Sequence, residues 1–162
     1  MYRPPPLLEC PVISRLGILL AGLLVSCGVP DPLVVKQFQL RDQKPLSTDD
    51  PMVRMEKERR LFGAVSMEER RGRLGQYYTL VWSDPNGAGN GEVELLFQYQ
   101  QGATASRIKR MARSFPASEA DGTAEFSVIG DNYFKGGKVL AWKATLRRGG
   151  REIASRQSYL WQ

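Results

Sequence analysis

The chain has 162 residues, of which 42% are hydrophobic and 25% charged, with a formal net charge of +6, two cysteines and no histidine. Its length suits one ordinary domain with a core of its own. The lack of histidine excludes a Ser-His-Asp or Cys-His nucleophile and a His-ligated zinc site, so we expect no enzyme here.

The first feature along the chain is an apolar run from Leu16 to Val25, with Arg15 on its amino side. A membrane-spanning helix needs roughly 20 apolar residues, so this run is too short to cross a bilayer comfortably. A buried core helix normally has a polar face, and this run has none. A positive charge followed by an apolar run predicts an export signal.

The run ends in the residues Leu-Val-Ser-Cys at 24–27, which resemble the lipobox of bacterial lipoproteins. The resemblance implies cleavage between Ser26 and Cys27, a diacylglyceryl group on Cys27, and acylation such as palmitate on the new amino group. Two or more such chains attach a protein stably to a membrane. Gly28, where Asp would favour the inner membrane, resembles the outer-membrane class. We therefore expect a signal peptide over 1–26 and a protein anchored by lipid in the bacterial outer membrane. The sequence does not indicate whether it faces the periplasm or the cell surface.

Processing would also change the thiols and the charge. Cys10 would be removed and Cys27 lipidated, which leaves no thiol for a disulfide, and a start near Val12 would give a more conventional leader. The mature chain would lose two of 23 basic and one of 17 acidic side chains, leaving 21 and 16, or +5. Because an exported protein seldom meets nucleic acid, we expect no such partner. Anionic lipid or glycan groups are the alternative partners, and simple solubility also accounts for the charge.

Residues 27–50 are expected to form a tether that contains a short candidate strand, with Val34, Phe38 and Leu40 on one side. A helix is predicted over 51–60, because Asp50 can cap it and a proline suits its first position.

Beyond this helix, Ser66 and Glu69 have the spacing of a capping box, but the glycines that follow limit the helix there to one or two turns. Alternating, β-rich segments then predict strands over 76–82, 92–99 and 123–130. Two longer alternating runs predict a hairpin around Gly149-Gly150. Its strands are expected to present Leu140, Trp142, Ala144 and Leu146, and then Ile153 through Tyr159 to Trp161.

Residues 106–115 are ambiguous, since their apolar residues have helical spacing while a strand would place basic residues on both faces. The surrounding strands favour a basic edge strand. The pattern as a whole predicts a mainly all-β chain: one domain over 51–162, a small antiparallel β-sandwich preceded by a short N-terminal helix. This layout resembles immunoglobulin-like or fibronectin type III-like domains, without the cysteine pair of antibody domains, and such a resemblance carries no function.

Candidate site residues fall into three groups. Carboxylates that could form a catalytic pair are explained more simply as solvated charges: Glu92, Glu94, Glu119, Asp121, Glu125 and Asp131. The turn over 84–91 partly matches a calcium loop, but Ala88 and Leu95 stand at ligand positions, so we expect no metal. Trp161 and Tyr133 could stack on sugars or belong to the core. Four basic residues could form a binding patch or a solvated edge: Arg107, Lys109, Arg110 and Arg113.

These patterns predict a membrane-anchored, non-catalytic structural or protein-interaction module that needs no cofactor. A surface glycan-binding module is the principal alternative, and a carboxylate-dependent hydrolase is a remote one. The partner and the oligomeric state are left open.

Overall fold

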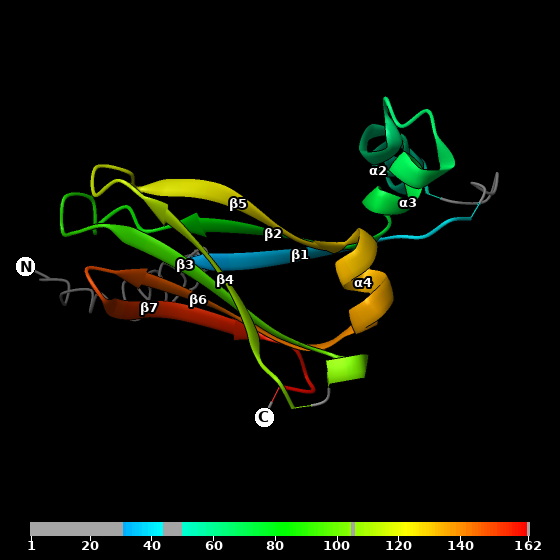
Figure 1. Cartoon of the computed structure of the whole chain (residues 1–162). Helices are drawn as coiled ribbons and strands as arrows, with labels where there is room; N and C mark the ends of the chain where they lie inside the picture. The colour runs from blue at the N-terminus through cyan, green and yellow to red at the C-terminus, as the bar shows by residue number, and fades with distance from the viewer. Residues whose placement is uncertain (1–30, 44–49, 105, 162) are drawn as a thin grey trace, which may run out of the picture. The chain divides into compact units, whose positions relative to one another are not determined.

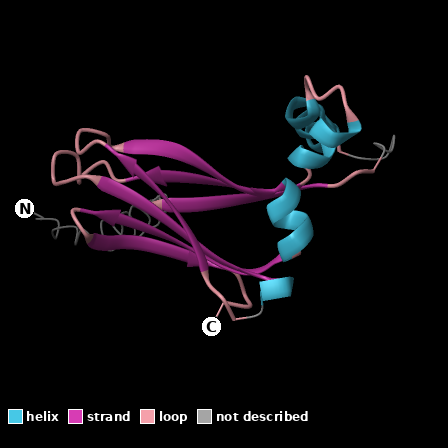
Figure 2. Cartoon of the chain, in the orientation of Figure 1, coloured by secondary structure: helices cyan, strands magenta, loops and turns pink. Residues whose placement is uncertain are grey.

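The computed structural model describes residues 31–43, 50–104 and 106–161 (Figure 1). Strands in two antiparallel sheets form 48% of this part of the chain and helices 23% (Figure 2), so the predicted mainly β fold with two packed sheets is confirmed. Its strands are β1 (Leu33–Leu40), β2 (Gly75–Ser83), β3 (Val93–Gln101), β4 (Lys109–Phe115), β5 (Asp121–Ile129), β6 (Val139–Arg148) and β7 (Arg151–Gln157).

One sheet has the strand order β1-β2-β5, and the other has the order β4-β3-β6-β7. Along β3 every second side chain is buried, which is the pattern of a strand with one face on the core. From β3, the ring of Phe97 reaches across to the other sheet. It stacks on Phe126 with 5.5 Å between centroids and lies 4.7 Å from the ring of Tyr78. These aromatic contacts join the two sheets into one core.

The helical segments are α2 (Pro51–Leu61), α3 (Met67–Arg73), η1 (Gly102–Thr104) and α4 (Gly130–Gly136). The side chain of Asp50 accepts a hydrogen bond from the Met52 amide at 2.7 Å, as the sequence predicts for the start of α2. Ser66 and Glu69 form the predicted capping box of α3.

The first strand corrects the predicted order of elements. β1 pairs with β2 along its whole length, from Leu33 opposite Trp82 to Leu40 opposite Gly75. The candidate strand expected within 27–50 is thus confirmed as β1, but it belongs to the sandwich, which therefore begins before residue 51. The helix α2 lies between β1 and β2 and does not precede the sandwich.

The burial of β1 explains why its sequence carries only a weak strand signal. Leu33 and Val35 pack on the main core, whereas Phe38 and Leu40 pack in a second cluster with residues from α2 and β2. Val34 lies on the same face as Phe38 and Leu40, as predicted, but it is 40% exposed because the second cluster does not reach it. No single face of the strand is apolar throughout, so simple alternation gave a weak signal.

The ambiguous segment and the hairpin are also settled. Residues 109–115 form β4, at one edge of the four-stranded sheet. The turn at Gly149-Gly150 joins β6 to β7 as predicted, but β7 ends at Gln157, so Tyr159 and Trp161 lie beyond it. Leu140 was predicted to point into the core, but it is 55% exposed. The register of β6 against β3 shifts beside it, so its side chain falls on the outer face of the sheet.

The directions of the strands give the sandwich two different ends. One end, the loop end, holds the start of β1 and the β2–β3, β4–β5 and β6–β7 connections. The opposite end, the helical end, holds α2, α3, η1 and α4 together with the end of β7 (Figure 1).

Arg148 closes the loop end. Its side chain is 4% exposed, and its Nε donates to Oδ2 of Asp84 at 2.7 Å. The remaining guanidinium nitrogens donate to the backbone carbonyls of Gly91, Ala117 and Glu119. One arginine thus holds two of the loops against the start of the hairpin turn.

Candidate functional site

Exposed large apolar side chains gather at the helical end. In the described part of the chain, Val34 and Ile153 are the ones that lie toward the loop end. The others lie on α2, α3, α4, the turns beside them, the start of β4 and β6, and the chain end: Met52, Val53, Met55, Phe62, Val65, Met67, Ile108, Phe134, Leu140, Tyr159 and Leu160. Apolar side chains gathered in one region of a surface mark sites of interaction more often than scattered ones do.

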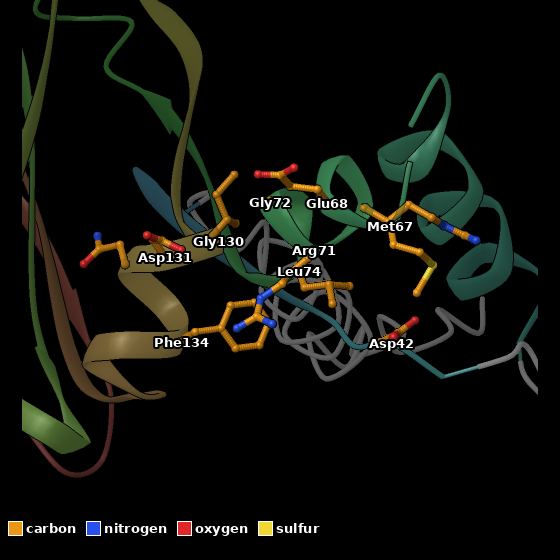
Figure 3. Close-up of a pocket in the computed structure, with 12 residues that line it drawn as sticks. Asp42, Met67, Glu68, Arg71, Gly72, Leu74, Gly130, Asp131 and Phe134 are labelled. Atoms are coloured by element: carbon orange, nitrogen blue, oxygen red, sulfur yellow. The ribbon is translucent and has the colours of Figure 1, made fainter. Parts of the chain in front are cut away.

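A cleft of about 1080 Å³ lies between α3 and α4 at this end (Figure 3). Met67, Leu74 and Phe134 supply apolar lining, and the Arg71 guanidinium lies 4.5 Å from the centre of the Phe134 ring. Figure 3 shows this arginine and ring against each other across the two helices. The cleft therefore offers a flat aromatic surface with a positive charge held over it.

A glycine at the start of α4 shapes the cleft. Gly130 has a φ of +55°, and its amide donates to the Leu74 carbonyl at 2.9 Å. A Cβ added to Gly130 would lie 2.9 Å from the carbonyl oxygen of Gly72 in α3. Only glycine combines this conformation with so close an approach, so Gly130 sets the distance between the two helices.

The charges of the cleft are mixed. Asp42, Glu68 and Asp131 supply carboxylates, and Arg70 and Arg71 supply guanidinium groups. The hydrogen bond from Lys135 and its charge hold the pKa of Asp131 below its ordinary value. The site is suited to binding a segment with both polar and apolar groups.

A second arrangement fixes α2 on the outer face of the three-stranded sheet. The Arg60 side chain is 6% exposed and lies 3.6 Å from the centre of the Tyr77 ring. Its guanidinium donates to the carboxylate of Glu125 at 2.7 and 3.1 Å and to Glu56 at 2.7 Å. Burial of the ring raises the pKa of Tyr77, against the opposing effect of Arg60. This arginine attaches the helix to the sheet.

The four basic residues considered as a binding patch or a solvated edge lie on β4 and just before it. Strand alternation places Lys109 and Arg113 on one face of β4 and Arg110 on the other, and Arg107 precedes the strand. Lys109 also donates to the side chains of Gln101, at 2.7 Å, and Asn132. The interpretation as a basic edge strand accounts for their positions.

The two aromatic candidates are both half-buried. Tyr133 packs against the main core from α4, and its hydroxyl accepts a hydrogen bond from the Gln39 side chain at 3.1 Å. Trp161 follows β7, and its amide donates to the Ser158 carbonyl at 3.1 Å. Nothing in these contacts joins the two rings into one platform.

The carboxylate candidates are spread over several elements. Glu94 pairs with Arg147, Glu125 with Arg60 and Asp131 with Lys135, while Glu92, Glu119 and Asp121 lie at turns or strand ends. Across residues 31–43, 50–104 and 106–161, no three or more carboxylate, Cys or His groups lie close enough to hold a metal ion. In the 84–91 turn, the Asp84 carboxylate is held by Arg148.

The predicted lipid site, Cys27, lies outside the described residues, as does the 1–26 signal. Among the helices that the structure describes, none is both long and apolar enough to span a membrane.

Sequence reasoning missed the cleft and the Arg60 attachment. Both depend on contacts between segments far apart in the chain, such as Arg71 with Phe134. The available signal was the glycine pair: Gly72 was interpreted as ending a helix, and Gly130 as ending a strand. Helix α3 does end at Arg73 and strand β5 at Ile129, and both glycines also stand where the two helices approach each other.

Comparison of the chain with family models, with curated proteins and with solved structures gave no match.

Proposed function

We propose that this protein is a lipid-anchored module of the bacterial outer membrane that binds another envelope protein through its helical end and catalyses no reaction. The support for the anchor is the sequence itself: Arg15 and the apolar run over 16–25, which predict an export signal, followed by Leu-Val-Ser-Cys at 24–27. Support for the interaction is the gathering of exposed apolar side chains and of the α3–α4 cleft at one end.

The position of β1 predicts which end of the domain lies near the anchor. Leu33 begins β1 at the loop end, six residues after Cys27. Six residues span at most about 20 Å, so a lipid on Cys27 would hold the loop end close to the membrane. β1 then runs eight residues, about 26 Å, to the helical end. In this arrangement, the apolar end of the domain lies on the side far from its anchor.

The strand order fits an immunoglobulin-like arrangement. β1-β2-β5 corresponds to strands A-B-E and β3-β6-β7 to strands C-F-G, with the fourth strand β4 paired to β3 instead of β5. Such domains serve many unrelated functions, so this correspondence supports the fold, and the function rests on the helical end.

The interaction is tested with photo-reactive residues in the native envelope. Probes at Met67 and Phe134, which line the cleft, are expected to capture the same neighbouring protein. A probe at Asn86, exposed in the β2–β3 turn at the loop end, is the matched control and should not capture it. Capture from Asn86 alone, or from none of the three positions, would contradict the proposal.

A further inference from the structure

On the side of α2 that faces the sheet most side chains are polar, with Leu61 packed in the second cluster, and the other apolar side chains of the helix are exposed to solvent. Arg60, Glu56 and Lys57 are partly or largely covered, whereas Met52 is 72% and Met55 63% exposed. No residue of α2 is fully buried. A surface helix normally has the opposite arrangement, with its apolar stripe on the core.

This orientation is fixed by specific contacts. The bond from Arg60 to Glu125 of β5 and its position over Tyr77 of β2 hold this side of α2 against the sheet, and Glu56 of the same helix also accepts from Arg60. The hydrogen bond from Arg59 and the charges of Arg59 and Arg60 hold the pKa of Glu56 below its ordinary value, against burial. The helix cannot turn its apolar side inward without breaking these bonds.

Most of the exposed side chains of α2 lie in one stripe along the helix. Met52, Met55, Glu58, Arg59 and Phe62 fall on one face about 120° wide, since each residue advances by about 100°. Phe62, at the end of the helix, is 84% exposed. The stripe is therefore apolar at both ends and carries one negative and one positive side chain at its centre.

Those central charges indicate which occupant fits. Insertion into a membrane would bring the Glu58 carboxylate toward hydrocarbon and anionic head groups, both of which oppose it. Arg59 already binds Glu56 of its own helix at 2.8 Å, whereas Glu58 is exposed, and a second copy of the same stripe brings an arginine opposite Glu58. With the helices antiparallel and a two-fold axis between residues 58 and 59, Glu58 faces Arg59 of the second copy and Met55 faces its Phe62.

We propose that α2 is a self-association surface through which two copies of this protein pair antiparallel. The proposal rests on the proposed function in one respect, the shared membrane anchor. An eleven-residue helix is only about 16 Å long, so such a contact falls short of the roughly 800 Å² per partner of a stable complex. Two copies held on one membrane meet at a high effective concentration, which allows a weak contact to form.

Charge reversal tests the pairing. Glu58→Lys and Arg59→Glu each replace two attractive contacts per dimer by two repulsive ones, and each should weaken association about tenfold. The double variant restores opposite charges across the axis and should recover dimer formation. Both side chains are exposed, but Arg59→Glu also removes the bonds from Arg59 to Glu56, so urea unfolding of each variant is compared with that of the natural chain.

Association is measured on membranes by a short thiol crosslinker. Cells producing a Met55→Cys chain together with a Phe62→Cys chain should yield a crosslinked dimer. The matched control, Met55→Cys alone, should yield several-fold less, because its two thiols are separated by about 10 Å along the helices. The natural chain shows any background from its own cysteines.

Three results would overturn the pairing: no excess of the mixed dimer over the control, single reversals without effect, or a double reversal that fails to restore association. Cleft probes at Met67 and Phe134 and a fatty-acid label report on the proposed function independently. A monomer that carries lipid and is captured through its cleft would therefore reject the pairing alone.

Discussion

Replacing Arg148 with methionine keeps much of the length of the side chain and removes its charge and all of its hydrogen bonds. The change leaves the Asp84 carboxylate, which is 17% exposed, without its partner, and three backbone carbonyls without their donor. Breaking a buried ion pair on one side costs about 3–5 kcal/mol. Since Asp84 is partly hydrated, we expect a loss of about 2–4 kcal/mol, a large part of the roughly 5–15 kcal/mol of a domain.

The assay is urea unfolding, read as a lower midpoint with an unchanged slope. Arg147→Met is the matched control. The Arg147 side chain is next to Arg148 in the chain, is 40% exposed and pairs with Glu94 only at 3.8 Å, so its replacement should cost less than about 1 kcal/mol. Adding Asp84→Asn to the Arg148 variant should recover part of the loss, because the carboxylate is then no longer unpaired. A loss for Arg148→Met no larger than the control's would refute the closing role of this arginine.

Three further predictions concern the core, the cleft and pH. Tyr78→Phe should leave stability unchanged or raise it by up to about 1 kcal/mol in urea unfolding, because the buried Tyr78 hydroxyl has no hydrogen-bond partner among the described residues. Gly130→Ala should lower the stability of the domain, because Gly130 has a positive φ and an added Cβ would contact Gly72. Gly72→Ala should instead stabilise α3 by about 0.5–1 kcal/mol, because its added Cβ meets no described atom within 4 Å. Thermal melts that rank the two variants the other way would contradict this account. Because the pKa of Glu56 is lowered in the fold, its contribution is present above the ordinary value of 4.5 and is lost as pH falls through the lowered pKa. Melting temperatures of Glu56→Gln should thus approach those of the natural chain in acid, and a constant difference would count against the Arg59 and Arg60 contacts.

Local signals in the sequence correctly predicted much of the fold. The caps at Asp50 and Ser66, the alternation of β3 and the Gly149-Gly150 turn each act within a few residues, and each was confirmed. The preference for an edge strand over 106–115 came from the neighbouring strands and was also confirmed.

Errors arose where distant contacts decide the outcome. The candidate strand within 27–50 was expected to lie in a tether, but it belongs to the sandwich because β2, over forty residues later, pairs with it. A register shift beside Leu140 reverses the face that uniform alternation assigns to it. The cleft between α3 and α4 and the attachment of α2 by Arg60 depend on pairs such as Arg71 with Phe134, which no local pattern specifies.

The anchor on Cys27 is the claim on which the proposed role depends most, and metabolic labelling with a fatty-acid probe tests it directly. The natural chain and Cys27→Ala are compared, and the mass of each mature protein is recorded. We predict that the natural chain is labelled and has a mass that begins at Cys27, and that the variant is unlabelled. An unlabelled natural chain, or one cut at another position, would contradict the account.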